Sequence, residues 1–161
     1  HSVNSTLKKH FFLAEVISVA PESKKGDEVI SAKQLKHLLK GKNPEAVVIR
    51  TLPNMANKKT KKFSNTNWPY LEEKAAVFLR ELGVEHVLID LPSVDKEKDD
   101  GKLLAHKAFW NYPQNPRMTA TITEFIYVNN RIKDGGYILN LQTAAFINDA
   151  TPSRPVLYKI S

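Results

Sequence analysis

One histidine and one carboxylate stand out as candidate ligands of a metal ion. His106 lies in the short apolar segment 103–110, and Glu124 lies in the apolar segment 121–128. An imidazole and a carboxylate, each held by its own apolar element, are donor types that a hydrolytic divalent metal needs from a protein. Catalytic metal sites have three protein ligands, however, so this pair alone predicts only part of a site.

Both residues also have a structural interpretation, which the local pattern leaves open. A histidine on an apolar helix is as compatible with a packed core as with a metal. Glu124 faces solvent if its strand simply alternates, but it shares a face with Ile122 and Ile126, which favours a buried position. A buried carboxylate needs a cation, an arginine or a metal as its partner. The other histidines have no acidic or histidine neighbour at ligand spacing and are interpreted as structural or surface residues: His1, His10, His37 and His86.

The elements that position these residues follow an α/β pattern with a β-rich last third. Runs of strand-forming residues predict strands at 11–19, 46–51, 84–89, 121–128, 137–144 and 156–160. Ser31 and Gln34 form a capping box that begins one helix. Further helices are predicted at 69–82 and 102–109, and a polar loop or turn is predicted at 21–28.

A second group of polar residues follows the predicted strand 84–89. Asp90 stands at the carboxyl end of that strand, and Ser93 and Asp95 come directly after it. Ligand sites in α/β sheets collect at the carboxyl ends of strands, so these residues are candidates for a site. The alternative is that the two aspartates only cap a turn, because Leu-Pro-Ser is typical turn chemistry.

Composition predicts one domain over residues 1–161. With 161 residues and 42% hydrophobic content, the chain can bury one core. It has no cysteine, which excludes disulfides, thiolate ligands and thiol catalysis, and no apolar run long enough to cross a bilayer. No serine lies in a nucleophile elbow, so nothing supports a serine triad. The cytoplasm is the default location, because any leader would precede His1.

The net charge of +7 raises the question of a nucleic-acid partner. The densest basic cluster is 58–62, inside the polar stretch 54–67. Neither a glycine-rich phosphate loop nor the aromatic-basic pattern of RNA-binding domains accompanies it. Such a run is more often a solvated loop than a binding surface, so we interpret it as a loop and expect no nucleic acid as partner.

Several short motifs occur along the chain in a characteristic order. They lie at 48–51 (VIRT), 69–71 (PYL), 83–84 (GV), 90–95 (DLPSVD), 105–106 (AH), 122–124 (ITE) and 152–155 (PSRP). In this order, from about Val16 to the end, they resemble the cyclase family of metal-dependent hydrolases, which includes bacterial kynurenine formamidase. Collinear agreement of several motifs is far more specific than any one of them.

The resemblance implies a fold, a cofactor and an activity. It implies a swivelling β/β/α fold, a mixed sheet with flanking helices, assembled into dimers or tetramers. It implies that His106 and Glu124 bind Zn²⁺ or Mn²⁺ and that a small-molecule amide, ester or cyclic C–N or C–O bond is hydrolysed. In such a site Asp90, Ser93 and Asp95 are expected to shape the floor. Nearness in sequence adds three candidates for substrate contact: Trp110, Tyr112 and Arg117.

The sequence also departs from the family pattern. The family's metal signature, His-x-Gly-Thr-His-x-Asp-x-Pro-x-His, has no counterpart here. We expect it, with the catalytic residues, upstream of His1, so the domain is interpreted as truncated at its N-terminus and weak in metal binding on its own. The insertion 111–117 is expected to reshape the pocket, so kynurenine is not assigned as substrate. The alternative is a catalytically inactive binding module on the same fold, with the basic loop 58–62 holding an acidic partner.

Overall fold

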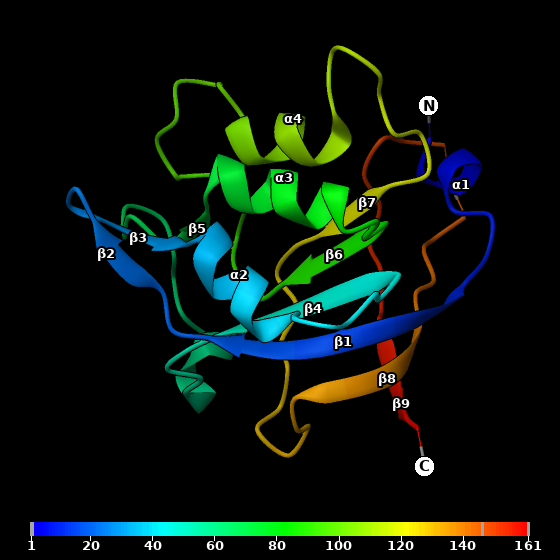
Figure 1. Ribbon diagram of the computed structural model, residues 1–161, viewed down its shortest axis with the longest axis horizontal. Coiled ribbons are helices and arrows are strands. Elements are labelled where there is room, and N and C mark those ends of the chain that lie inside the picture. The colour runs from blue at the N-terminus through cyan, green and yellow to red at the C-terminus, as the bar shows by residue number, and fades with distance from the viewer. Residues whose placement is uncertain (1, 146, 161) are drawn as a thin grey trace.

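A six-stranded mixed sheet forms the main layer of the computed structural model, which describes residues 2–145 and 147–160 (Figure 1). The strand order is β7-β6-β4-β1-β8-β9. Four strands run parallel: β1 (Phe11–Val19), β4 (Ala46–Thr51), β6 (His86–Ile89) and β7 (Thr121–Thr123). Two strands extend the sheet in antiparallel pairs: β8 (Gly135–Asn140) against β1, and β9 (Val156–Lys159) against β8.

Three helices cover one face of this sheet (Figure 1). They are α2 (Ala32–Leu38), α3 (Glu73–Glu81) and α4 (Leu104–Trp110). A small second sheet with the order β2-β3-β5 lies beside them and contains β2 (Glu22–Lys24), β3 (Asp27–Ile30) and β5 (Tyr70–Leu71). The remaining helical turns are α1 (Val3–Thr6) and the 3₁₀ turn η1 (Ala56–Lys59). The predicted α/β fold, a mixed sheet with flanking helices, is confirmed.

Alternating side chains divide the apolar residues of the central strands between two cores. On β1, Ile17 packs in the core beneath the helices, whereas Val16 packs in the core on the opposite face. On β4, Val47 and Val48 divide in the same way. Successive residues of a strand point to opposite faces, so a strand that is apolar at every position must be covered on both sides. These central strands therefore give the site a rigid support.

Two strands and one helix boundary were predicted well. Strands 11–19 and 46–51 occur as predicted. The capping box is also present, because the Ser31 hydroxyl accepts from the Gln34 amide while the Gln34 side chain accepts from the Ser31 amide. These elements are specified by residues that lie close together in the sequence, which explains the success.

Three local predictions were wrong. Residues 21–28 are largely a hairpin of β2 and β3 rather than a loop. The helix predicted from residue 69 begins at Glu73, because Tyr70 and Leu71 pair with β3. The strand predicted for 121–128 ends at Thr123, and Phe125 then adopts a left-handed backbone with φ of 57° that redirects the chain. Glu124 consequently lies just beyond its strand. Within residues 2–145 and 147–160, no helix has the length and apolar character needed to span a bilayer.

Candidate metal-binding site

Asp95 fixes the start of the helix that carries His106. The first amides of a helix have no partner within the helix and need an external acceptor. The carboxylate of Asp95 accepts from the backbone amide of Ala105 at 2.6 Å and from that of His106 at 3.4 Å. Asp95 is therefore a capping group that acts across the loop 96–103, and it ties α4 to the end of the β6 region.

The same carboxylate orients the His106 ring. Nδ1 of His106 lies 2.6 Å from Oδ2 of Asp95. Burial raises the pKa of Asp95, but the hydrogen bonds from His106 and from the Ala105 amide outweigh burial, and the pKa is lowered overall. An ionised Asp95 accepts, so Nδ1 is the donor, and Nε2 is the ring nitrogen that points away from Asp95 towards Glu124. This arrangement is the one that prepares a histidine to bind a metal.

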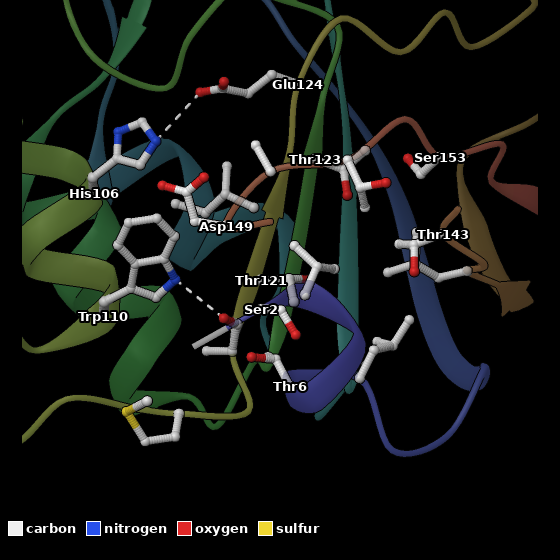
Figure 2. A pocket seen from close by; sticks show the side chains of 18 of the residues that line it. Ser2, Thr6, His106, Trp110, Thr121, Thr123, Glu124, Thr143, Asp149 and Ser153 are labelled. Carbon is white, nitrogen blue, oxygen red and sulfur yellow. Dashed lines mark hydrogen bonds and ion pairs between the residues drawn. The ribbon is translucent and has the colours of Figure 1, made fainter. Parts of the chain in front are cut away.

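Glu124 meets His106 from the other side. Its Oε1 lies 3.6 Å from Nε2 of His106 (Figure 2). The same oxygen accepts a hydrogen bond from the Val94 amide at 2.9 Å. The backbone amide of Phe125 donates to the Leu91 carbonyl at 2.9 Å, which holds the turn that carries Glu124. The glutamate side chain is 28% exposed. The partly buried position predicted for it is therefore supported by a backbone hydrogen-bond donor.

The pair borders a cavity of about 660 Å³. Trp110 packs beside His106 with ring centroids 5.1 Å apart, and its indole N–H donates to the Ala120 carbonyl at 3.1 Å, which fixes the ring (Figure 2). Tyr112 lines the same cavity and is largely exposed. All three residues predicted to contact substrate, Trp110, Tyr112 and Arg117, line this cavity; contact with a substrate itself stays a prediction.

Arg117 is held by the protein rather than free to bind an anion. Its guanidinium donates to the carbonyls of Phe109 at 3.2 Å and Val84 at 2.7 Å, and it stacks over the Phe109 ring. Burial lowers the pKa of Arg117. The guanidinium therefore braces the insertion 111–117 against the core, and only the remainder of the side chain is available to shape the cavity.

The residues predicted to form the floor lie outside the lining of this cavity. Asp90 accepts from the amide and hydroxyl of Thr51 and from Nζ of Lys58 at 2.9 Å. Ser93 accepts from the Asp95 amide at 3.1 Å. Asp90 therefore fixes Thr51 and Lys58 rather than contacting the site, and Ser93 shapes the turn that presents Asp95. The prediction of a wholly solvated basic loop was wrong for Lys58, whose side chain is only 13% exposed.

Some lining residues carry no signal in the sequence. The short helix α1 contributes Ser2 and Thr6, and the segment 149–153 contributes Asp149 and Ser153 (Figure 2). These two ends of the chain meet because the Val3 amide donates to the Asn148 carbonyl at 2.9 Å. Only the long-range packing of the chain brings them to His106. His1, which was interpreted as structural or surface, lies outside the described residues.

The donor pair fits one side of a metal site. Two tetrahedral zinc ligands with bonds of about 2.1 Å lie roughly 3.4 Å apart, close to the 3.6 Å between Nε2 of His106 and Oε1 of Glu124. Within residues 2–145 and 147–160, no group of three or more histidine, cysteine or acidic side chains is placed to hold an ion. The described residues therefore offer two candidate ligands, and a complete site needs others.

Solved structures show which class of fold carries this site. A predicted metal-dependent hydrolase from Bacillus stearothermophilus matches with a TM-score of 0.65 at 16% sequence identity, over 91% of this chain and 62% of its own. A potential metal-dependent hydrolase with cyclase activity gives 0.67 at 14% identity, over 97% and 74%. Isatin hydrolase A from Labrenzia aggregata gives 0.59 at 12% identity, over 91% and 59%. The fold is that of these metal-dependent hydrolases, as predicted.

The sequence places the chain in a family. The profile described as "Putative cyclase" matches residues 2–96, and the chain belongs to this family. A search of curated protein sequences finds no match. The chain spans 62% of the length of the Bacillus protein. The matched residues contain Asp90, Ser93 and Asp95, whereas His106 and Glu124 lie beyond them, so the role of that pair rests on its geometry.

Proposed function

We propose that this chain forms the metal-binding part of a cyclase-family hydrolase that cleaves a formamide-like amide, an ester or a cyclic C–N or C–O bond of a small molecule. The observation that carries the proposal is the state of His106. Its Nδ1 is fixed by Asp95, and its Nε2 faces Glu124 at 3.6 Å across the rim of a large cavity. A buried structural histidine needs neither a carboxylate that fixes its Nδ1 nor a cavity beside its Nε2.

Each residue of this group has a defined task. Asp95 accepts the hydrogen bond from Nδ1–H and makes Nε2 a stronger electron-pair donor to a metal ion. Glu124, kept in place by the Val94 amide, offers an oxygen beside it. Zn²⁺ or Mn²⁺ bound there would polarise a carbonyl and lower the pKa of a bound water. Trp110 is held rigidly by Ala120 and offers a flat apolar wall for the substrate.

The remaining ligands and the catalytic groups are proposed to come from sequence upstream of the described residues in a longer protein. The support is local. The described residues offer two candidate ligands where a site needs at least three, and Ser2 lines the same cavity, so a segment entering α1 passes near His106. Neither nucleic acid nor membrane is among the proposed partners.

A second copy of the chain is the proposed protein partner, in a dimer or tetramer. Leu13, Ile138 and Tyr158 form a cross-strand row on β1, β8 and β9, and they are 56%, 38% and 52% exposed. Adjacent exposed apolar side chains of this kind are typical of interfaces. Light scattering should give a mass above that of a monomer, and Tyr158→Lys should lower it. A monomer for the unaltered chain would contradict this part of the proposal.

A catalytically inactive binding module is the second candidate. The observation that favours it is the lack of a third ligand within the described residues, together with Lys59 and Lys61, which form no ion pair there. Such a module would use the basic loop 58–62 to hold an acidic partner. It has no use for the His106 and Glu124 geometry, so metal binding discriminates the two candidates.

The test is a calorimetric titration of the chain with Zn²⁺ and with Mn²⁺ at neutral pH. We expect weak one-to-one binding of at least one of these ions, lowered at least about tenfold by His106→Ala and by Glu124→Gln. His37→Ala is the matched control, because His37 is an exposed histidine on α2, and it should bind as the unaltered chain does. If neither ion binds, or if the unaltered protein and all three variants bind equally well, the proposal fails and the binding module is favoured.

A further inference from the structure

A second cavity, of about 220 Å³, lies on the other side of Phe125 from the site described above. The basic loop forms one wall and the turn after β7 forms the other. Phe125 lines both cavities. The lining residues are Lys58, Lys59, Lys61, Phe63, Asp90, Phe125, Ile126 and Tyr127. The cavity therefore combines several lysines with several aromatic rings in a small space.

The three lysines differ in how their charge is compensated. Lys58 is mostly buried and donates to Asp90 at 2.9 Å and to the Thr51 carbonyl at 2.6 Å, so its charge is neutralised and it fixes the loop. Lys59 and Lys61 are exposed, and within residues 2–145 and 147–160 neither pairs with a carboxylate. The cavity is thus left with two uncompensated positive charges at its mouth.

Both free lysines lie over aromatic rings. Nζ of Lys59 is 4.5 Å from the centroid of Tyr127, and Nζ of Lys61 is 4.9 Å from that of Phe63. The rings of Phe63 and Phe125 meet edge to face with centroids 6.0 Å apart. Cation–π contacts hold an ammonium group near a ring without neutralising it. The ammonium groups of Lys59 and Lys61 therefore lie beside aromatic rings and keep the charge that can bind an anion.

The backbone of Phe125 has an unfavourable conformation that the surrounding structure holds in place. Its side chain is 66% exposed, yet its backbone has φ of 57°, a region unfavourable for residues with a large side chain. The turn places an aromatic ring at the surface where no apolar core requires it. Exposed aromatic rings that line a cavity are a common feature of sites for small apolar or aromatic ligands.

We propose that this cavity binds a small aromatic carboxylate. The ring would lie against Phe125 and Tyr127, and the carboxylate would accept from the ammonium groups of Lys59 and Lys61. An inorganic phosphate fits less well, because the cavity offers no arginine fork among its lining residues and much of its wall is aromatic. Neither His106 nor Glu124 lines this cavity, so the binding of an aromatic carboxylate can be tested independently of the metal-dependent activity.

The test uses benzoate as probe, with binding measured by calorimetry and located by the backbone amide shifts of the ¹⁵N-labelled chain. We expect benzoate to bind and to shift the amides of 58–63 and 125–127. Benzyl alcohol, which lacks the charge, and cyclohexanecarboxylate, which lacks the ring, should each bind several-fold more weakly. Phosphate that competes as well as benzoate, or shifts confined to the amides of 106–112, would overturn the proposal.

Matched variants test whether benzoate binding depends on Lys59 and Lys61 or only on the net charge of the protein. The double change Lys59→Gln with Lys61→Gln should weaken benzoate at least about tenfold, because it removes both charge-assisted hydrogen bonds. Lys33→Gln with Lys40→Gln removes the same charge at exposed positions in and just after α2 and should leave affinity within about twofold. His106→Ala should bind benzoate as the unaltered chain does. Equal affinity in the two double variants would contradict the proposal.

Discussion

His106 on α4 and His86 on β6 show two different uses of one residue type. His106 lies at the rim of a cavity with a carboxylate on each side. His86 is buried on β6, where Nδ1 lies 2.8 Å from the Thr121 hydroxyl and the ring packs on Phe12 with centroids 4.0 Å apart. Burial lowers the pKa of His86 to about 4. His106, the candidate ligand, differs from His86 because its Nε2 faces a carboxylate at the rim of a cavity, whereas the His86 ring is enclosed by packing.

The largest expected effect concerns the packing residue. His86→Ala should lower the free energy of unfolding by about 3 kcal/mol, because it leaves a cavity beside Phe12 and removes the partner of Thr121. Chemical denaturation followed by tryptophan fluorescence measures the change. His106→Ala is the control and should cost less, because His106 lies at the rim of a cavity and the Ala105 amide still donates to Asp95 in that variant. A larger loss of stability for His106→Ala than for His86→Ala would invalidate the comparison.

The second prediction concerns pH. The folded pKa of His86, about 4, lies below its unfolded value of about 6.5, so the unfolded chain binds the proton more readily. His86 therefore favours folding above pH 6.5, and this advantage is lost as pH falls towards 4, at up to about 1.4 kcal/mol per pH unit. Between pH 6.5 and 5 the loss should reach about 1.5 kcal/mol, because the full slope is reached only below the unfolded pKa.

The variant His86→Ala provides the control for this pH dependence. Its stability should change less between pH 6.5 and 5, so the gap between the two chains narrows as the pH is lowered. Denaturation series at several pH values measure both slopes. Parallel slopes for the two chains would show that other groups cause the pH dependence.

The third prediction concerns the group that positions His106. Asp95→Asn should weaken Zn²⁺ binding about tenfold or more, because an amide no longer holds Nδ1 in its protonated form as firmly. The Asn side chain still has an oxygen that can accept from the Ala105 amide, so the start of α4 is kept. Calorimetric titration beside a thermal unfolding curve separates the two effects. Unchanged Zn²⁺ affinity would exclude the positioning role.

The strands that support the site could be predicted because their signal is local. Residues 11–19 and 46–51 are apolar runs, and a strand covered on both faces needs nothing more to be recognised. The hairpin of β2 and β3 was missed because its first strand, Glu22–Lys24, is polar and exposed. The turn between the two strands has one signal in the sequence, Gly26. In the structure Lys25 and Gly26 both have positive φ, as in a tight two-residue hairpin.

The candidate site could be predicted only in part. The motif order suggested that His106 and Glu124 belong together, and the structure places them 3.6 Å apart. That Asp95 orients His106 was not foreseen, because the loop between them gives no sign of how it folds. The contributions of α1 and of Asp149 depend on contacts between the two ends of the chain, which no local pattern encodes.

The most direct test of the account is the state of the His106 ring nitrogens, measured by long-range ¹H–¹⁵N correlation with His106→Ala to assign the signals. Nδ1 should carry a proton with and without metal, because it donates to Asp95, and added Zn²⁺ should shift Nε2 of His106 while the signals of His86 stay unchanged. A Zn²⁺ response at Nδ1 in place of Nε2, or no response of either nitrogen, would contradict the claim that His106 is a prepared metal ligand.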